Sequence, residues 1–494
     1  GKSYSKVKHD AEHPLKDRIV SYSDETQNRS DIIRHDYRIG MEYDFAKAHT
    51  ISLAYTGQWR STDSENRTTG SSISNQGSNI HNYIHNVDLA YSLPFGLQMA
   101  ISYTNYQNPR SQLLHGTLLD TEKDYTTESN QKISKWLVTV DQVHELKKGW
   151  ELMYGIKGQF TKNNSYQTTY DKSSNPIPDA TSVSDYKERI LNAYAGFSKQ
   201  FSEVFSLDAS IAAEQYHTPK WNEWHIYPSF SAMWNVNPDN ILNFSFSSDY
   251  QYPNYWSTMN SIYYSSAYSE IWGNPDLKPY SHYELDLMWQ FKRKYTVMAF
   301  ARFNPDYSVQ LPYQPTDRMV VIMKETNFNY SNSYGLEATA QFEAGKWLNG
   351  NVAATGFYRH DKSNNFFDLP FSRNAFTALL SATVSAKLSN RHNVRFVLNP
   401  SFQSKAIQGV YDIRPIFKLN ASLHWTSDNS KWSLIASGSN LTNSYLKSRS
   451  LYSNQNFTLR MWQDHVSCSL TAIYKIGNFK DKKYKNIDTS RMGY

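Results

Sequence analysis

The sequence lacks most of the features on which enzymatic or metal chemistry depends. It has one cysteine, Cys468, in 494 residues, which excludes an intramolecular disulfide and a cysteine-based metal site. It has no His-Glu-x-x-His, Gly-x-Ser-x-Gly, phosphate-binding loop or dinucleotide fingerprint, and His144-Glu145 begins the first of these without its second histidine. We therefore predict no catalytic residue, no metal ligand, no cofactor and no enzymatic activity.

Long hydrophobic runs are also missing. No segment approaches the roughly 18 consecutive apolar residues of a transmembrane helix, so the chain could span a membrane only as a closed β-barrel. No signal peptide is visible at Gly1-Lys2-Ser3-Tyr4, as expected for a mature or truncated chain. The net charge is +6, but lysine and arginine are scattered rather than gathered on one face, so we predict no nucleic-acid partner.

Aromatic residues, by contrast, are abundant. They make up 15% of the chain, with 37 Tyr, 24 Phe and 13 Trp, although the mean hydropathy is only -0.66. Low hydropathy combined with many aromatics is typical of barrel strands, which expose every second residue to lipid. Tyrosine and tryptophan also suit the two membrane interfaces. Tryptophans near predicted strand ends, such as Trp221 and Trp432, fit an interfacial girdle better than ligand stacking.

Apolar and polar residues alternate over long segments. Residues 334–343 place Tyr, Leu, Ala, Ala and Phe on one face and Gly, Glu, Thr, Gln and Glu on the other. Segments 205–214, 283–291, 417–425 and 466–476 repeat this pattern, which puts Cys468 on the lipid face. Mid-strand charges such as Asp286 and Glu337 require a wet lumen or a polar plug. The alternative is a soluble β-sandwich, whose strands are usually shorter, about 5–6 residues.

Short turns and long polar loops alternate along the chain, as in outer-membrane barrels. Counting across the turns predicts an all-β transmembrane antiparallel barrel with about nineteen strands, from one ending near Phe45 to one ending near Ile476. Bacterial barrels have even numbers of strands, and large transporters have 22. We therefore expect about three further strands before Gly1, which would leave Gly1 and the polar residues 2–18 in an extracellular loop.

We predict two regions, a barrel over residues 1–476 and a basic periplasmic tail over residues 477–494. The tail carries Lys480, Lys482, Lys483, Lys485 and Arg491. We expect these side chains to be solvated. The alternative is contact with anionic headgroups or with a periplasmic factor.

The most distinctive loop spans residues 250–279 and is rich in aromatic side chains. Such side chains bury a large area at low entropic cost, so an exposed cluster is a good recognition surface. We predict a ligand- or partner-contact loop above the lumen. The alternative is packing on neighbouring loops or on a lipoprotein. The predicted contact residues are Tyr252, Tyr255, Trp256, Tyr263, Tyr264, Tyr268 and Trp272.

The same loop ends in Gly273-Asn274-Pro275-Asp276-Leu277-Lys278-Pro279, which resembles the Gly-Asn-Pro-x-Leu-Lys-Pro stretch of TonB-dependent outer-membrane receptors. Residues 334–337 and 439–443 resemble two further barrel segments of that group. The end of the chain, residues 474–493, is similar to the C-termini of its Bacteroidota-type outer-membrane β-barrel family. The resemblance covers the barrel portion only, because the plug domain and TonB box of such receptors are not present in this sequence.

The resemblance implies a receptor in the outer membrane of a Gram-negative bacterium, surrounded by lipid and lipopolysaccharide. It would import a ligand bound by extracellular loops, energised by TonB through a missing N-terminal segment. One alternative is a non-transporting structural or partner barrel, held in an outer-membrane complex with a surface lipoprotein. Another is a membrane hydrolase with Ser and His facing out of the wall. Iron chelates, haem, cobalamin, glycans and peptides all enter through this fold, so the substrate is not predicted.

Overall fold

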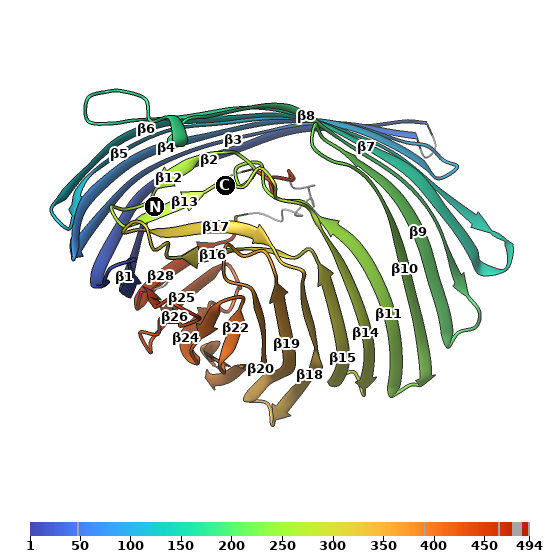
Figure 1. Cartoon of the computed structure of the whole chain (residues 1–494). Coiled ribbons are helices and arrows are strands. Elements are labelled where there is room, and N and C mark those ends of the chain that lie inside the picture. The colour runs from blue at the N-terminus through green and yellow to red at the C-terminus, as the bar shows by residue number, and fades with distance from the viewer. Residues whose placement is uncertain (47–48, 390, 463–464, 477–486, 493–494) are drawn as a thin grey trace.

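A computed structural model describes residues 1–46, 49–389, 391–462, 465–476 and 487–492 (Figure 1). One antiparallel sheet of 24 strands curls into a barrel wall, and a second sheet of four strands lies inside it. The prediction of an all-β antiparallel barrel is confirmed. The two 3-10 helices, η1 (Lys147–Gly149) and η2 (Pro178–Ala180), are single turns. Within the described ranges, no helix has the length and apolar character needed to cross a membrane.

The first half of the wall consists of long strands, each hydrogen-bonded to its neighbour in the chain. They continue well past the roughly 9–11 residues that cross a bilayer, so one end of the wall extends beyond the membrane. These strands are β1 (Lys2–Pro14), β2 (Ile19–Ala46), β3 (His49–Gly70), β4 (Ser72–Ser92), β5 (Leu97–Leu118), β6 (Thr121–Leu146), β7 (Trp150–Tyr170), β8 (Ser182–Gln200), β9 (Phe205–His217), β10 (Asn222–Asn237) and β11 (Asn240–Gln251).

The second half of the wall has shorter strands, and four of its crossings are each divided in two. These are β21 with β22, β23 with β24, β25 with β26, and β27 with β28. Counting each divided crossing once, and leaving out β1, recovers the predicted nineteen. The strands are β14 (Tyr280–Phe291), β15 (Tyr295–Pro305), β18 (Tyr330–Ala344), β19 (Leu348–Ser363), β20 (Phe371–Ser389), β21 (Val394–Gln403), β22 (Ala406–Gln408), β23 (Tyr411–Ile413), β24 (Ile416–Thr426), β25 (Trp432–Ser439), β26 (Leu446–Ser450), β27 (Phe457–Trp462) and β28 (Ser467–Tyr474).

The start of the chain differs from the prediction. Residues 2–18 were expected in an extracellular loop, yet β1 pairs with β2 from Lys2↔Asp31 to Pro14↔Ile19. The Ile32 amide donates a hydrogen bond to the Gly1 carbonyl at 2.7 Å, so Gly1 lies beside the middle of β2. Polar cross-strand pairs hold β1 in place. Because this strand is polar on both faces, it gives no period-2 hydrophobic signal.

The two ends of the sheet meet at β1. From Lys6↔Trp462 to Ala11↔Phe457, β1 also pairs with β27, so the first strand lies beside the last crossing. Beyond this ladder, and among the described residues, β28 pairs with β25 alone and the second half of β2 with β3 alone. All of β28 and residues 33–45 are exposed on both faces. The predicted total of 22 strands stays a prediction.

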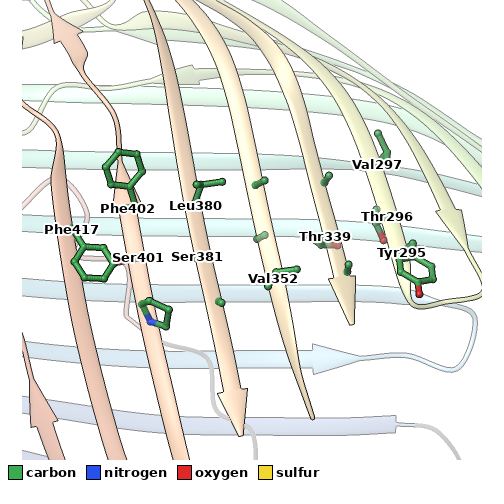
Figure 2. Close-up of a pocket in the computed structure, with 16 residues that line it drawn as sticks. Tyr295, Thr296, Val297, Thr339, Val352, Leu380, Ser381, Ser401, Phe402 and Phe417 are labelled. Atoms are coloured by element: carbon green, nitrogen blue, oxygen red, sulfur yellow. The ribbon is translucent and has the colours of Figure 1, made fainter. Parts of the chain in front are cut away.

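The outward face of the wall is apolar where the membrane would surround it. A shallow hollow of about 600 Å³ lies across β15, β18, β19, β20, β21 and β24, and none of the described residues that line it is charged. Its rim carries exposed side chains such as Val297, Leu380, Phe402 and Phe417 (Figure 2). Only lipid-compatible side chains line this region, as expected for the hydrocarbon level of a transmembrane wall.

The interior sheet is built by two long connections that fold into the barrel. The first joins β11 to β14 and forms β12 (Ile262–Tyr264) and β13 (Ser269–Trp272). The second joins β15 to β18 and forms β16 (Ser308–Tyr313) and β17 (Val321–Asn327). Their order is β12-β13-β17-β16, with β13 and β17 parallel, and Figure 1 shows them enclosed by the wall. We call these four strands the inner sheet.

Candidate ligand-binding cavity in the lumen

The aromatic loop lies inside the barrel and not above it. Tyr255 and Tyr268 are only 1% exposed, and the remaining predicted contact residues are half-buried. The prediction that these side chains form an exposed surface above the lumen is therefore wrong. The loop packs against wall strands inside the barrel, which is a placement that neither of the two expectations gave. Whether any of these side chains contacts a ligand stays a prediction.

Tyr268 fastens the inner sheet to the first strands. Its ring stacks on Tyr22 of β2 with centroids 3.9 Å apart, and its hydroxyl is hydrogen-bonded to His13 Nδ1 at 2.9 Å. Tyr22 and Tyr268 belong to one apolar cluster, which also includes Leu311 and Val321 of the inner sheet and Phe457 of β27. Burial raises the pKa of Tyr268, so the phenol stays protonated.

The opposite edge of the inner sheet is held by polar side chains of the wall. Gln76 Nε2 of β4 donates to the Tyr263 hydroxyl at 2.8 Å, and Gln112 Nε2 of β5 donates to the Tyr264 carbonyl at 2.7 Å. The Arg110 guanidinium donates to the same Tyr263 hydroxyl and lies 4.4 Å from its ring centroid. These donors explain how a tyrosine-rich edge can be buried without losing its hydrogen bonds.

An ion pair between the exposed Arg318 and the buried Glu270 joins the two loops of the inner sheet. Arg318 donates to both oxygens of Glu270, at 3.1 and 3.0 Å, and the Trp272 indole donates to the same carboxylate at 2.8 Å. Trp272 therefore orients a carboxylate instead of pointing toward open space. Such paired contacts fix geometry more than they add stability.

The family-like motif has a structural task at the exit of this loop. A Cβ at Gly273 would lie 1.8 Å from the Met259 carbonyl oxygen, so only glycine fits there. Asn274 is buried and donates to the Glu325 carbonyl at 2.9 Å, while the Lys278 amide donates to Asn327 Oδ1 at 2.8 Å. Leu277 and Pro279 are buried, and Pro275 is exposed. The motif ties the loop to β17 and leads the chain into β14.

A polar cavity of about 500 Å³ lies between wall strands β3 to β6 and the aromatic loop of residues 250–279, which we call the inner loop. Of the predicted contact residues, Trp256 is among its lining. The described residues that line it are Arg60, Thr62, Ile80, Asn82, Asn108, Arg110, Ser129, Gln131, Asn254, Trp256, Ser490 and Met492. Two guanidinium groups and several amides line this space, and none of the lining residues that the structure describes carries a carboxylate. The arrangement suits a ligand that carries negative charge or many acceptor oxygens.

Sequence reasoning missed the cavity residues, and it also missed where part of the tail lies. The predicted solvation does not hold for Arg491, whose guanidinium pairs with Glu188 of β8 at 2.6 Å. Ser490 and Met492 of the same segment line the cavity. The lysines at 480, 482, 483 and 485 lie outside the described residues. The predicted division at residue 476 and the periplasmic tail stay predictions.

One group of metal-type ligands occurs among the described residues, outside the lumen. Ligand atoms of His115, Glu122 and Asp124 lie within 4.8 Å of one another. The Lys172 ammonium sits 2.8 Å from both Glu122 oxygens. The cluster is thus an exposed ion-pair network that already holds a cation, and we assign no metal to it.

The curved sheet with an apolar outer face and a polar interior defines a transmembrane outer-membrane β-barrel. The sequence matches the model of the outer membrane protein beta-barrel family over residues 96–474, and the chain belongs to that family. Its location is therefore the outer membrane. The sequence matches no curated protein.

Solved structures with a similar fold are outer-membrane receptors of low sequence identity. The ferripyoverdine receptor of Pseudomonas aeruginosa, solved with ferripyoverdine bound, is 12% identical with a TM-score of 0.57 over 93% of this chain and 71% of its own. The ferric yersiniabactin uptake receptor of Yersinia pestis is 10% identical with a TM-score of 0.53 over 93% of this chain and 79% of its own. At such identities the likeness concerns the fold.

Proposed function

We propose that the protein is a TonB-dependent outer-membrane receptor that binds an oxygen-rich, anionic ligand in the lumenal cavity before import. The cavity carries this proposal, because it combines Arg60 and Arg110 with a Trp256 ring and because no carboxylate occurs among its described lining residues. Its volume of about 500 Å³ falls within the range of about 300–1,000 Å³ of small-molecule sites. Membership of an outer-membrane barrel family supports the setting.

The wall strands supply the donors that such a ligand needs. Arg60 comes from β3, Asn82 from β4, Arg110 from β5 and Gln131 from β6, so four neighbouring strands converge on one space. Arginine presents planar, charged donors that match carboxylate, hydroxamate or catecholate oxygens. Trp256 adds an apolar ring for stacking. Ferric chelates combine acceptor oxygens with negative charge, and the two receptors of similar fold are described with ferric ligands.

The test is direct binding to the full-length protein in detergent, with ferripyoverdine as the first probe and a panel of ferric catecholates and carboxylates after it. Trp256 lies in the cavity, so a bound ferric chelate should quench its fluorescence, and Trp256→Phe should reduce that signal. Replacing Arg60 and Arg110 together by glutamine should weaken binding by at least about 100-fold, because each charge-assisted hydrogen bond contributes roughly 1.5–3 kcal/mol.

The matched control is Arg67→Gln, which removes an exposed arginine of the same strand as Arg60. It should leave the affinity unchanged. Equal affinity of the double variant and the control would contradict the cavity as the binding site. Absence of binding across the whole panel would contradict the ligand class.

A second measurement separates transport from a partnership role. Ligand binding to a TonB-dependent receptor should increase capture of the periplasmic TonB domain from the same organism. Ligand binding without any TonB capture would instead favour the non-transporting barrel that works with a surface lipoprotein.

A further inference from the structure

Arg491 lies in a buried polar cluster in the lumen, where each of its side-chain nitrogens donates a hydrogen bond. Its two terminal nitrogens donate to the two oxygens of Glu188, at 2.6 and 2.8 Å, and its Nε donates to the Pro253 carbonyl at 3.0 Å. The guanidinium carbon lies 4.2 Å from the Tyr255 ring centroid and 4.9 Å from that of Tyr252. The guanidinium thus has a bidentate carboxylate, a carbonyl and two aromatic rings around it.

One tyrosine of the wall and one of the inner loop hold the Glu188 carboxylate in position for this cation. It is only 2% exposed, and Tyr255 and Tyr216 donate their hydroxyl groups to its oxygens at 2.9 and 3.3 Å. A buried carboxylate without a cation would be costly. The carboxylate therefore requires a positively charged occupant, and its fork geometry favours a guanidinium over an ammonium.

Contacts on both sides of Arg491 extend the docking to the whole segment 487–492. Met492 is buried in an apolar cluster with Ile84, Tyr106 and Ile133 of the wall and Tyr255 of the loop. The Lys135 ammonium donates to the Asp488 carbonyl at 2.8 Å and to its carboxylate at 3.1 Å. The Tyr255 amide donates to the Arg491 carbonyl at 3.0 Å. Segment 487–492 therefore makes charged, apolar and backbone contacts with the wall and the inner loop.

We propose that the lumen contains a guanidinium-binding site, formed by Glu188, Tyr252 and Tyr255, and that its occupant is the chain's own C-terminal segment 487–492. The docked segment joins the inner loop to wall strands β4, β5, β6 and β8 and supplies Ser490 and Met492 to the cavity wall. The segment is therefore an intramolecular strap that completes the cavity. This inference does not depend on the ligand class or on TonB.

The strap can be tested with a thiol reporter in the full-length protein. Cys468→Ser removes the native thiol, and Met492→Cys places a new one at the buried end of the strap. We expect slow labelling by a polar maleimide, compared with Ser174→Cys on an exposed loop. Adding Glu188→Gln should accelerate labelling of the buried thiol by about 100-fold, as expected for loss of one partner of a buried ion pair. Glu203→Gln, an exposed carboxylate, should not.

The arginine variants identify the group that is recognised. Arg491→Met should accelerate labelling as much as Glu188→Gln does, Arg491→Lys should lie between, and the double variant should add nothing further. Every variant must keep heat-modifiable migration, which shows that the barrel is intact. A thiol at position 492 that reacts as fast as the one at position 174, or a Glu188→Gln variant that labels no faster, would overturn the proposal.

The outcome is independent of the ligand experiment. A protected strap in a protein that binds no ferric chelate would leave the guanidinium site standing and remove the proposed ligand. A freely reactive strap in a protein that binds such a chelate would do the reverse.

Discussion

A single methyl group at Gly273 should loosen the inner loop without damaging the barrel. The added Cβ would lie 1.8 Å from the Met259 carbonyl oxygen and 2.9 Å from its carbon, whereas ordinary van der Waals contact begins near 3.4 Å. Both obstacles are backbone atoms, so no side-chain rotation relieves them. Overpacking of this kind costs about 1–3 kcal/mol, which corresponds to a roughly 5- to 150-fold increase in the open population of the loop.

The assay is limited proteolysis of the folded protein in detergent with chymotrypsin, which cleaves at the aromatic residues of the loop. When opening is fast, the cleavage rate follows the open population. Gly77→Ala is the matched control, because nothing lies within 4 Å of its Cβ position. We expect fast cleavage in Gly273→Ala and unchanged cleavage in Gly77→Ala, with heat-modifiable migration retained in both. Equal cleavage rates would refute the steric reasoning.

Two further perturbations test the wall and the strap. Leu287→Arg, on the outward face next to Phe244, should destabilise the barrel by about 2–4 kcal/mol if it lies near the bilayer midplane. Ser245→Arg, on the inward face, should destabilise it far less. Chemical unfolding in lipid vesicles measures both free energies. Burial raises the pKa of Asp488, but hydrogen bonds from Ser490 and the charge of Lys135 lower it from 3.8 to about 2. The ionised Asp488 therefore stabilises the docked segment fully above the ordinary pKa of the carboxyl group, and this stabilisation is lost as the pH falls toward 2. Amide hydrogen exchange of residues 487–492 should therefore become faster as the pH falls through this window, beyond the intrinsic pH dependence of exchange. The increase should be less than about tenfold, because the Asp488 side chain is 61% exposed. Asp488→Asn should abolish this pH-dependent increase.

The wall could be predicted from the sequence because its signal is local. Alternation within one strand indicates which residues face lipid, and short turns indicate where each membrane-crossing strand ends. The wall strand that was missed, β1, is polar on both faces and is held by cross-strand ion pairs. Lys6 and Lys8 each bond to Glu25 at 2.7 Å. Such pairs become visible only when the partner strand and its register are known.

The cavity and the strap could not be predicted in this way. Arg60 and Arg110 lie on different strands, and Glu188 is 303 residues from Arg491. The same aromatic composition fits a loop that is exposed and a loop that is buried, so composition alone could not place residues 250–279. The motif at Gly273 carried a usable hint, since a glycine required by backbone contact implies tight packing nearby.

The two sides of the inner sheet are fastened by different kinds of interaction, and this difference has a mechanical consequence. Toward β1, β2 and β27, apolar side chains such as Tyr22, Leu311 and Phe457 form one buried cluster, and each fully buried side chain of this size contributes about 1.5–3 kcal/mol. Toward β4 and β5, the contacts are amide and guanidinium hydrogen bonds such as those from Gln76 and Gln112. Because water can replace these partners, an amide hydrogen bond contributes a net of only about 0.5–1.5 kcal/mol, and one from a guanidinium contributes about 1.5–3 kcal/mol. The β12 edge of the inner sheet therefore separates from β4 and β5 at lower cost than the apolar edge separates from β1, β2 and β27, whereas the loop beside the cavity is held by the buried cluster of the strap.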